Sequence, residues 1–184
     1  MKKIVFIPFL FLLTLIGFTS CQKDDSLDPL PIRVAGQYLK LDITKKRLNF
    51  DDINNTSFGG YLTNPGNNVV KFNLYVRKKD IYGFATDFAL VKTVTSFPSD
   101  LNITPNDIAT ALNVPLNTLV FGDNYRFYGE SFNAAGDRAD FYSLSATIQG
   151  APSYKQAYRF VTDMTNNDGF TSGELNGFDN YTAQ

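Results

Sequence analysis

Residues 70–77 read Val-Lys-Phe-Asn-Leu-Tyr-Val-Arg, an unbroken alternation that decides the expected fold. Successive side chains of a β-strand point to opposite faces of the sheet. Val70, Phe72, Leu74 and Val76 would therefore share one face, and a mostly polar set would share the other. This pattern predicts a half-buried strand whose apolar face is turned toward a core.

The segment before this strand is its expected partner. Residues 58–63 have strand composition, and Gly59-Gly60 either weakens that strand or marks a bulge. The intervening Asn64-Pro65-Gly66 is a turn signal, because proline presets the first central dihedral and glycine accepts a positive φ at the next. The sequence thus predicts that the strand over 58–63 pairs with the strand over 70–77.

Similar segments recur at regular spacing along the chain. They predict further strands over residues 39–43, 88–94, 125 and beyond, 138–148 and 157–164, with a hairpin turn at 133–137. About seven such strands make a small β-sandwich. The 17 Phe and 10 Tyr residues can supply its core by aromatic burial.

One short helix is expected between the strands. Thr104 is a good N-cap, and Pro105 suits the first helical position. Ile108, Ala111 and Leu112 then fall on one helical face. The sequence predicts that this helix is a crossover between strands and not a functional element.

The amino-terminal region ends at Cys21, the only cysteine in the chain. Lys2 and Lys3 precede a charge-free apolar run over residues 4–20, which predicts a secretory signal of the lipoprotein type with Cys21 as the lipidated residue. A permanent anchor is an alternative, although the run of 17 residues contains Pro8 and is shorter than the ~20 residues of a spanning helix. An ordinary cleaved signal, the other alternative, would leave an unpaired thiol.

The residues around Cys21 indicate where in the cell the protein is located. Residues 17–20, Gly-Phe-Thr-Ser, fit a lipobox loosely, with small residues at the last two positions. Lys23, Asp24 and Asp25 resemble the surface-export signal of Bacteroidota lipoproteins, and Ser26 lies in a short pattern that resembles an O-glycosylation acceptor there. The alternative is a plain polar linker. The resemblance implies a lipid-anchored protein of the outer membrane that is exposed at the cell surface.

These signals divide the chain into four parts. We predict a signal peptide over residues 1–20, a lipidated tether over 21–33, a sandwich over 34–164 and a loop-rich tail over 165–184. Without residues 1–20 the chain is mildly acidic and has only short basic runs. A nucleic-acid partner is therefore not expected, since such proteins need a basic face.

The composition removes several kinds of catalysis. The chain has no histidine, which excludes Ser-His-Asp and Cys-His chemistry and most zinc sites. The acids Glu130, Asp137 and Asp140 fall near one hairpin, where solubilising acids are common. Residues 163–174 have the length of a calcium loop, but Asp168 occupies the position that requires glycine. We predict no catalytic residues, no metal and no cofactor.

Aromatic side chains are the remaining candidates for a binding site. Tyr82 and Phe84 flank a glycine in a predicted loop, where sites on sandwiches are usually found. Tyr128 is offset from Tyr125 and Phe127 in its strand, and Tyr142 lies next to Phe141, so each could face outward. These four residues are predicted to bind a glycan or a peptide. The alternative for each is an aromatic that covers its own sheet.

The middle of the chain resembles a known group of proteins. Residues 90–98, Ile103-Thr104 and residues 122–127 are similar to small lipoproteins found with Sus-type nutrient uptake systems, which pair a TonB-dependent transporter with a SusD-like lipoprotein. The resemblance implies an immunoglobulin- or fibronectin-III-like sandwich and a non-catalytic accessory or ligand-binding role beside such partners. It is fold-level analogy. The alternative is a structural lipoprotein that packs on an outer-membrane partner without a ligand.

Overall fold

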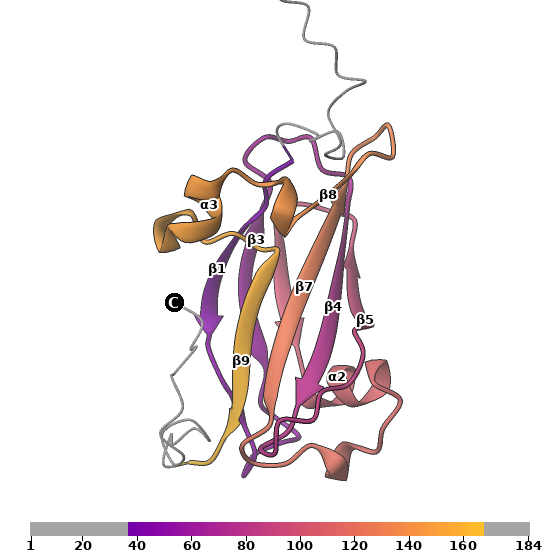
Figure 1. Ribbon diagram of the computed structural model, residues 1–184, viewed down its shortest axis with the longest axis vertical. Coiled ribbons are helices and arrows are strands. Elements are labelled where there is room, and N and C mark those ends of the chain that lie inside the picture. The colour runs from indigo at the N-terminus through magenta and orange to yellow at the C-terminus, as the bar shows by residue number, and fades with distance from the viewer. Residues whose placement is uncertain (1–36, 168–184) are drawn as a thin grey trace, which may run out of the picture. The chain divides into compact units, whose positions relative to one another are not determined.

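Two β-sheets face each other across one apolar core in the computed structural model of the chain, which describes residues 37–167 (Figure 1). The smaller sheet is antiparallel and consists, in spatial order, of β1 (Lys40–Lys45), β3 (Phe58–Thr63) and β6 (Ser99–Ile103). The larger sheet consists, in spatial order, of β2 (Leu48–Asn49), β9 (Arg159–Thr165), β7 (Asn124–Phe132), β4 (Lys71–Lys79) and β5 (Ala89–Val94), with β8 (Arg138–Asp140) also paired to β7. The predicted all-β sandwich is confirmed.

Aromatic rings from both sheets fill the centre. The ring centroid of Phe58 on β3 lies 5.5 Å from those of Phe127 on β7 and Phe160 on β9. Phe127 and Phe160 stack on each other at 5.0 Å. Aromatic pairs at these distances contribute about 0.5–1.5 kcal/mol each beyond their area burial. The core thus ties the two sheets together through one stacked triplet.

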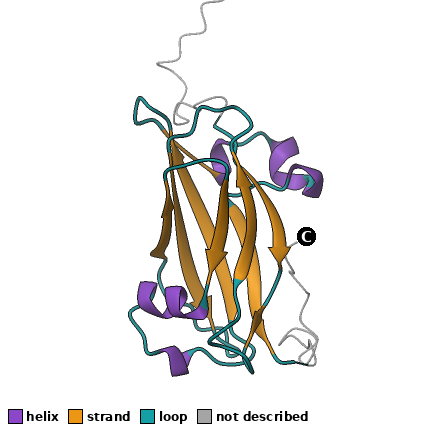
Figure 2. Cartoon of the chain, turned by 180° about the vertical axis from the view of Figure 1, so that it is seen from behind, coloured by secondary structure: helices purple, strands orange, loops and turns teal. Residues whose placement is uncertain are grey.

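Short helices lie near the two ends of the strands (Figure 2). They are α2 (Pro105–Ala111) and α3 (Ala146–Gly150), with single 3₁₀ turns at η2 (Leu116–Thr118), η3 (Phe141–Ser143) and η4 (Pro152–Tyr154). α2 begins as predicted, because the Thr104 side chain accepts from the Asp107 N–H and the Asp107 carboxylate accepts from the Thr104 N–H. It crosses from β6 in the smaller sheet to β7 in the larger one.

The predicted pairing of the strands at 58–63 and 70–77 is wrong. Both strands exist, but β3 pairs with β1 and β6, whereas β4 pairs with β5 and β7. The turn after β3 does form, with the Asn67 N–H donating to the Asn64 carbonyl. It carries the chain from one sheet to the other. Val70 lies in this connection and is 48% exposed, while Val69 is buried in its place.

The predicted strand over 138–148 is also wrong beyond its first three residues. The hairpin turn is present, since the Asn133 N–H donates to the Asp137 carbonyl. β8 then stops at Asp140, whose side chain caps η3 by accepting from the N–H groups of Tyr142 and Ser143. A local side chain to backbone interaction of this kind replaces the strand ladder.

Residues 37–167 contain nine strands, not about seven. β2 and β6 were not predicted. β2 has only two residues, which is too short to show a period. β6 has only two apolar residues, Leu101 and Ile103, in its short alternation with Asp100 and Asn102. β9 ends at Thr165, which is buried and lies one residue inside the predicted tail. α3 is a second α-helix within the described residues, where only one was expected. The immunoglobulin- or fibronectin-III-like connectivity stays a prediction.

Candidate binding surface

The side of the larger sheet that faces away from the core carries the most distinctive side chains; we call it the outer face. Along β4, the residues of the outer face alternate with the buried Phe72, Leu74 and Val76. The register places Tyr75 opposite Tyr128 and, two residues on, Arg77 opposite Arg126. Members of the outer face across the sheet are Tyr75, Arg77, Phe88, Leu90, Arg126, Tyr128 and Arg159.

Aromatic rings and guanidinium groups contact one another on the outer face. The Phe88 ring centroid lies 6.0 Å from that of Tyr128, tilted by 53°, and the Arg77 guanidinium lies 5.1 Å from the Phe88 centroid. Arg159 is directly opposite Tyr128 in the β7–β9 ladder. Its guanidinium lies 5.2 Å from the ring of Phe141. Cation–π contacts of this kind hold planar cations against ring faces.

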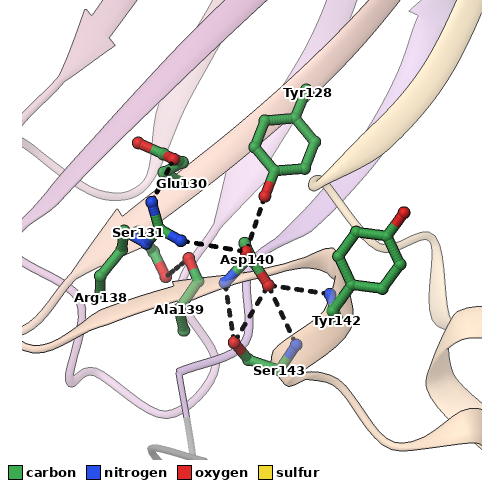
Figure 3. A network of polar contacts seen from close by, with 8 residues as sticks. All are labelled: Tyr128, Glu130, Ser131, Arg138, Ala139, Asp140, Tyr142 and Ser143. Atoms are coloured by element: carbon green, nitrogen blue, oxygen red, sulfur yellow. Dashed lines mark hydrogen bonds and ion pairs between the residues drawn. The ribbon is translucent and has the colours of Figure 1, made fainter. Parts of the chain in front are cut away.

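Asp140 organises the upper part of this region (Figure 3). Its Oδ2 accepts a hydrogen bond from the Tyr128 hydroxyl at 2.7 Å and lies 3.6 Å from an Arg138 nitrogen. Its Oδ1 accepts from the N–H groups of Tyr142 and Ser143 at 2.9 and 3.1 Å. Arg138 also pairs with Glu130 at 3.0 Å. The network fixes the Tyr128 ring and the start of η3 in one arrangement.

The network also sets the protonation of its members. Burial raises the pKa of the Tyr128 hydroxyl, and the Asp140 carboxylate beside it raises the pKa further. Burial alone would raise the pKa of Asp140, but hydrogen bonds from Tyr128 and Ser143 outweigh it and lower the pKa below the ordinary aspartate value. At neutral pH Asp140 is therefore an ion that accepts hydrogen bonds and Tyr128 is a neutral donor.

The loop between β4 and β5, residues 80–87, presents two aromatic rings to solvent. The Asp80 carboxylate accepts from the N–H groups of Tyr82 and Phe84 at 3.0 and 2.9 Å, and the Asp80 N–H donates to the Phe84 carbonyl. With the backbone tied in this way, Tyr82 is 81% exposed and Phe84 is 77% exposed. Two large rings exposed in one loop are candidates for contact with a ligand or a partner.

This loop and the start of the described chain lie at opposite ends of β4. Gln37 donates to the Asp137 carbonyl beside the β7–β8 turn, close to the end of the sheet where Lys71 begins β4. β4 is nine residues long and ends at Lys79, and the loop 80–87 follows. A strand of that length spans roughly 27 Å.

The predicted site residues therefore separate into two groups. Tyr128 and Tyr142 meet around Asp140, although Tyr142 lies in η3 and not in a strand, and it is 67% exposed. Tyr82 and Phe84 lie in the loop, as predicted. Cys21 and the predicted export signal, Lys23-Asp24-Asp25, lie outside the described residues.

Three arginines of the outer face were not among the predicted site residues: Arg77, Arg126 and Arg159. Each is an ordinary polar residue within its own strand. Only the β4–β7 and β7–β9 pairings, which join residues far apart in the sequence, bring them beside Tyr128. Phe88 belongs to a predicted strand, but its contact with both Arg77 and Tyr128 likewise depends on the β4–β7 pairing.

A buried ion pair lies apart from the outer face and is structural. Asp123 is fully buried, and its Oδ2 is 3.2 Å from Lys78 Nζ. The same oxygen accepts from the Val120 N–H at 2.9 Å. Within residues 37–167, no cluster of three or more acidic or cysteine side chains is placed to hold a metal ion.

Comparison with known proteins adds no relative to this picture. No protein-family model, curated protein or solved structure matches the chain. In the part that the structure describes, no helix has the length and apolar character needed to cross a membrane.

Proposed function

We propose that this chain is a lipid-anchored lipoprotein of the outer-membrane surface that binds a glycan without transforming it, as an accessory component of a nutrient uptake complex. The observation that carries the proposal is the apolar run over residues 4–20 that ends at the only cysteine, Cys21, followed closely by Lys23-Asp24-Asp25. Lipidation gives that cysteine a role, and the charged triplet supplies the export address.

The exposed rings of the sandwich support a binding role. A short tether would precede Gln37 at one end of β4, whereas Tyr82 and Phe84 lie at the other end. A domain attached in this order can turn the aromatic loop away from the membrane. Tethering beside a transporter also raises the local concentration of a weakly bound ligand, so modest affinity suffices.

The state of the acidic side chains supports a role without catalysis. A glycosidase needs one carboxylic acid that holds its proton and a second carboxylate placed for attack. Glu130 and Asp140 both pair with Arg138, and the pKa of Asp140 is lowered by its hydrogen bonds despite the opposing effect of burial. Both carboxylates are ion-paired within the fold, and Asp140 does not hold the proton that a catalytic acid must donate.

Replacing Cys21 with Ala is expected to release the chain from membranes, because the thioether that carries the lipid cannot form. Fractionation of cells and mass spectrometry of the mature amino terminus measure this. In the unmodified protein we expect lipid on Cys21 and cleavage by protease added to intact cells. Retention of the Cys21→Ala chain in membranes, together with an unmodified terminus, would exclude the anchor.

The double substitution Tyr82→Ala with Phe84→Ala is expected to weaken glycan binding at least about tenfold. Truncating an aromatic side chain that the bound ligand buries usually costs more than ~1 kcal/mol of binding free energy for each ring. The loss should be the same for charged and neutral glycans, because stacking does not depend on charge. Calorimetric titration of the full-length chain measures it, and far-UV circular dichroism checks the fold. Unchanged binding would move the aromatic contact to Tyr128 and Tyr142.

A second candidate function is a structural lipoprotein that packs on an outer-membrane partner. The observation that favours it is the edge strand β5, where Leu90 is half exposed, together with Phe88 directly before it, which is nearly half exposed. An apolar sheet edge can receive another chain. Isolation of the chain in a stable complex that no glycan displaces, with no glycan bound by the free chain, would favour this candidate over the first.

A further inference from the structure

We infer that the outer face of the larger sheet selects acidic polysaccharides, with carboxylates on the sugar rings bound by Arg77, Arg126 and Arg159 around Tyr128. This inference rests on the proposed glycan-binding function and names the class of glycan. Three features of the outer face carry it: the placement of the arginines, their lack of carboxylate partners within the fold, and the aromatic rings between them.

The arginines converge from three adjacent strands. Arg77 on β4 is directly opposite Arg126 on β7. Opposed side chains in an antiparallel pair have Cβ atoms about 4.5–5.5 Å apart. Arg159 on β9 is opposite Tyr128, which lies two residues beyond Arg126 on the same face. Three arginines thus lie on the same face of the sheet as Tyr128, and each planar guanidinium group can bind a carboxylate through two parallel hydrogen bonds.

The fold does not neutralise these charges. None of the three arginines forms an ion pair with another residue in the range 37–167. Arg77 Nε is buried and has no hydrogen-bond partner there. By contrast, Arg138 on β8 of the same sheet forms ion pairs with both Glu130 and Asp140.

Like charges placed directly opposite each other in a sheet are destabilising. The Arg77–Arg126 pair therefore lowers the stability of the free protein, and an anion between the two guanidinium groups would relieve the repulsion. Asp163, which is opposite Asn124 in the β7–β9 ladder, accepts a hydrogen bond from the Asn124 side chain at 2.6 Å. An anionic ligand is favoured here over a neutral one for this reason.

The rings decide which kind of anion fits. The ring centroids of Phe88 and Tyr128 lie 6.0 Å apart, the Arg77 guanidinium lies over Phe88, and the Arg159 guanidinium lies over Phe141. Flat rings beside guanidinium groups match a chain of sugar rings that bear carboxylates. A single small anion or a flexible acidic peptide would use the arginines and leave the rings uncovered. The geometry points to uronate-type sugars in a polymer.

The test compares two forms of one polymer on the full-length chain purified in detergent. Polygalacturonate carries a carboxylate on each sugar, and its fully methyl-esterified form keeps the rings without the charge. We expect calorimetric titration to show that Arg126→Gln with Arg159→Gln weakens binding of polygalacturonate at least about tenfold, since a charge-assisted hydrogen bond is worth about 1.5–3 kcal/mol. Binding of the ester should change less than about twofold.

The matched control is Lys45→Gln with Lys46→Gln, which removes the same two charges from an exposed stretch that begins in the smaller sheet. We expect it to leave binding of both polymers within about twofold of the unmodified chain. The substitution Arg126→Lys keeps the charge but loses the planar fork, so an intermediate loss is expected. Circular dichroism of each variant confirms that the sandwich is intact.

Several results would overturn the inference. These are an equal loss in the lysine control, unchanged polygalacturonate binding in the arginine variant, or equal affinity of the unmodified chain for the ester. Polyglutamate bound as tightly as polygalacturonate would identify an acidic peptide ligand instead. Each leaves the proposed function standing if Tyr82→Ala with Phe84→Ala still weakens glycan binding. If the unmodified chain binds neither polymer and no neutral glycan, both the inference and the proposed glycan-binding function are wrong.

Discussion

The substitution Gly60→Ala is expected to lower the free energy of unfolding by more than about 4 kcal/mol, enough to unfold a marginally stable domain. A Cβ atom at Gly60 would lie 1.9 Å from the Asp42 carbonyl oxygen and 2.8 Å from the Ile43 Cα. These are backbone atoms of the neighbouring strand β1. They cannot rotate away as a side chain would, so the ladder itself would have to open.

The position of Gly60 makes such a shift costly. β3 is the central strand of the smaller sheet, and Gly60 is paired with Ile43 on one side and Leu101 on the other. Its neighbour Gly59 has φ +145°, and a Cβ there would lie 1.9 Å from the Leu101 carbonyl oxygen. The register of β1 shifts between Ile43 and Lys45, opposite this pair. The two glycines thus permit a close approach of three strands.

Gly150→Ala is the matched control, because no atom lies within 4 Å of the added Cβ. It also lies in α3, where alanine is the better helix former, so stability should be unchanged or slightly raised. Urea denaturation followed by circular dichroism compares the two variants. A loss below about 1 kcal/mol for Gly60→Ala would show that β1 and β3 can separate locally without cost to the fold.

Local signals in the sequence predicted the elements that depend on local chemistry. The alternation over 70–77 specified β4, because half burial of a strand imposes a period of two. Thr104 and Pro105 specified the start of α2, because a helix needs a cap for its free N–H groups. Gly59-Gly60 indicated a bulge, and the register shift opposite them is present.

Pairing between distant segments could not be predicted in the same way. The turn at Asn64 is formed, yet β3 and β4 belong to different sheets: β3 pairs with β1 and β6, and β4 pairs with β5 and β7. Asp140 ends the strand predicted over 138–148 by capping η3 with its side chain. An aspartate can also lie at the end of a strand without forming a cap, so the residue alone does not predict which of the two occurs. The arginines of the outer face were missed for the same reason, since only long-range register makes them neighbours.

The substitution Phe72→Ala is expected to lower the free energy of unfolding by about 3–5 kcal/mol. Phe72 is fully buried on the inner side of β4, and its ring meets that of Tyr158 edge to face at 6.0 Å. Removal of the ring loses the buried apolar area of Phe72 and leaves Tyr158 without its aromatic partner. Val70→Ala is the control, because Val70 is 48% exposed and its loss should cost less than about 1 kcal/mol. Urea denaturation measures both.

Gly129 shows why Phe72 fits its site, and it sharpens the test. A Cβ at Gly129, on the neighbouring strand β7, would lie 2.6 Å from two carbon atoms of the Phe72 ring and 3.0 Å from the Ala157 carbonyl oxygen. Gly129→Ala alone should therefore destabilise the fold by overpacking, by roughly 1–3 kcal/mol. In the Phe72→Ala background the ring is gone, and the added methyl group occupies part of the space that it leaves. The two losses should then be less than additive by at least about 0.5 kcal/mol, because the residues are in contact. Strict additivity, or a Phe72→Ala loss no larger than that of Val70→Ala, would mean that the inner side of β4 does not pack against β7 as described.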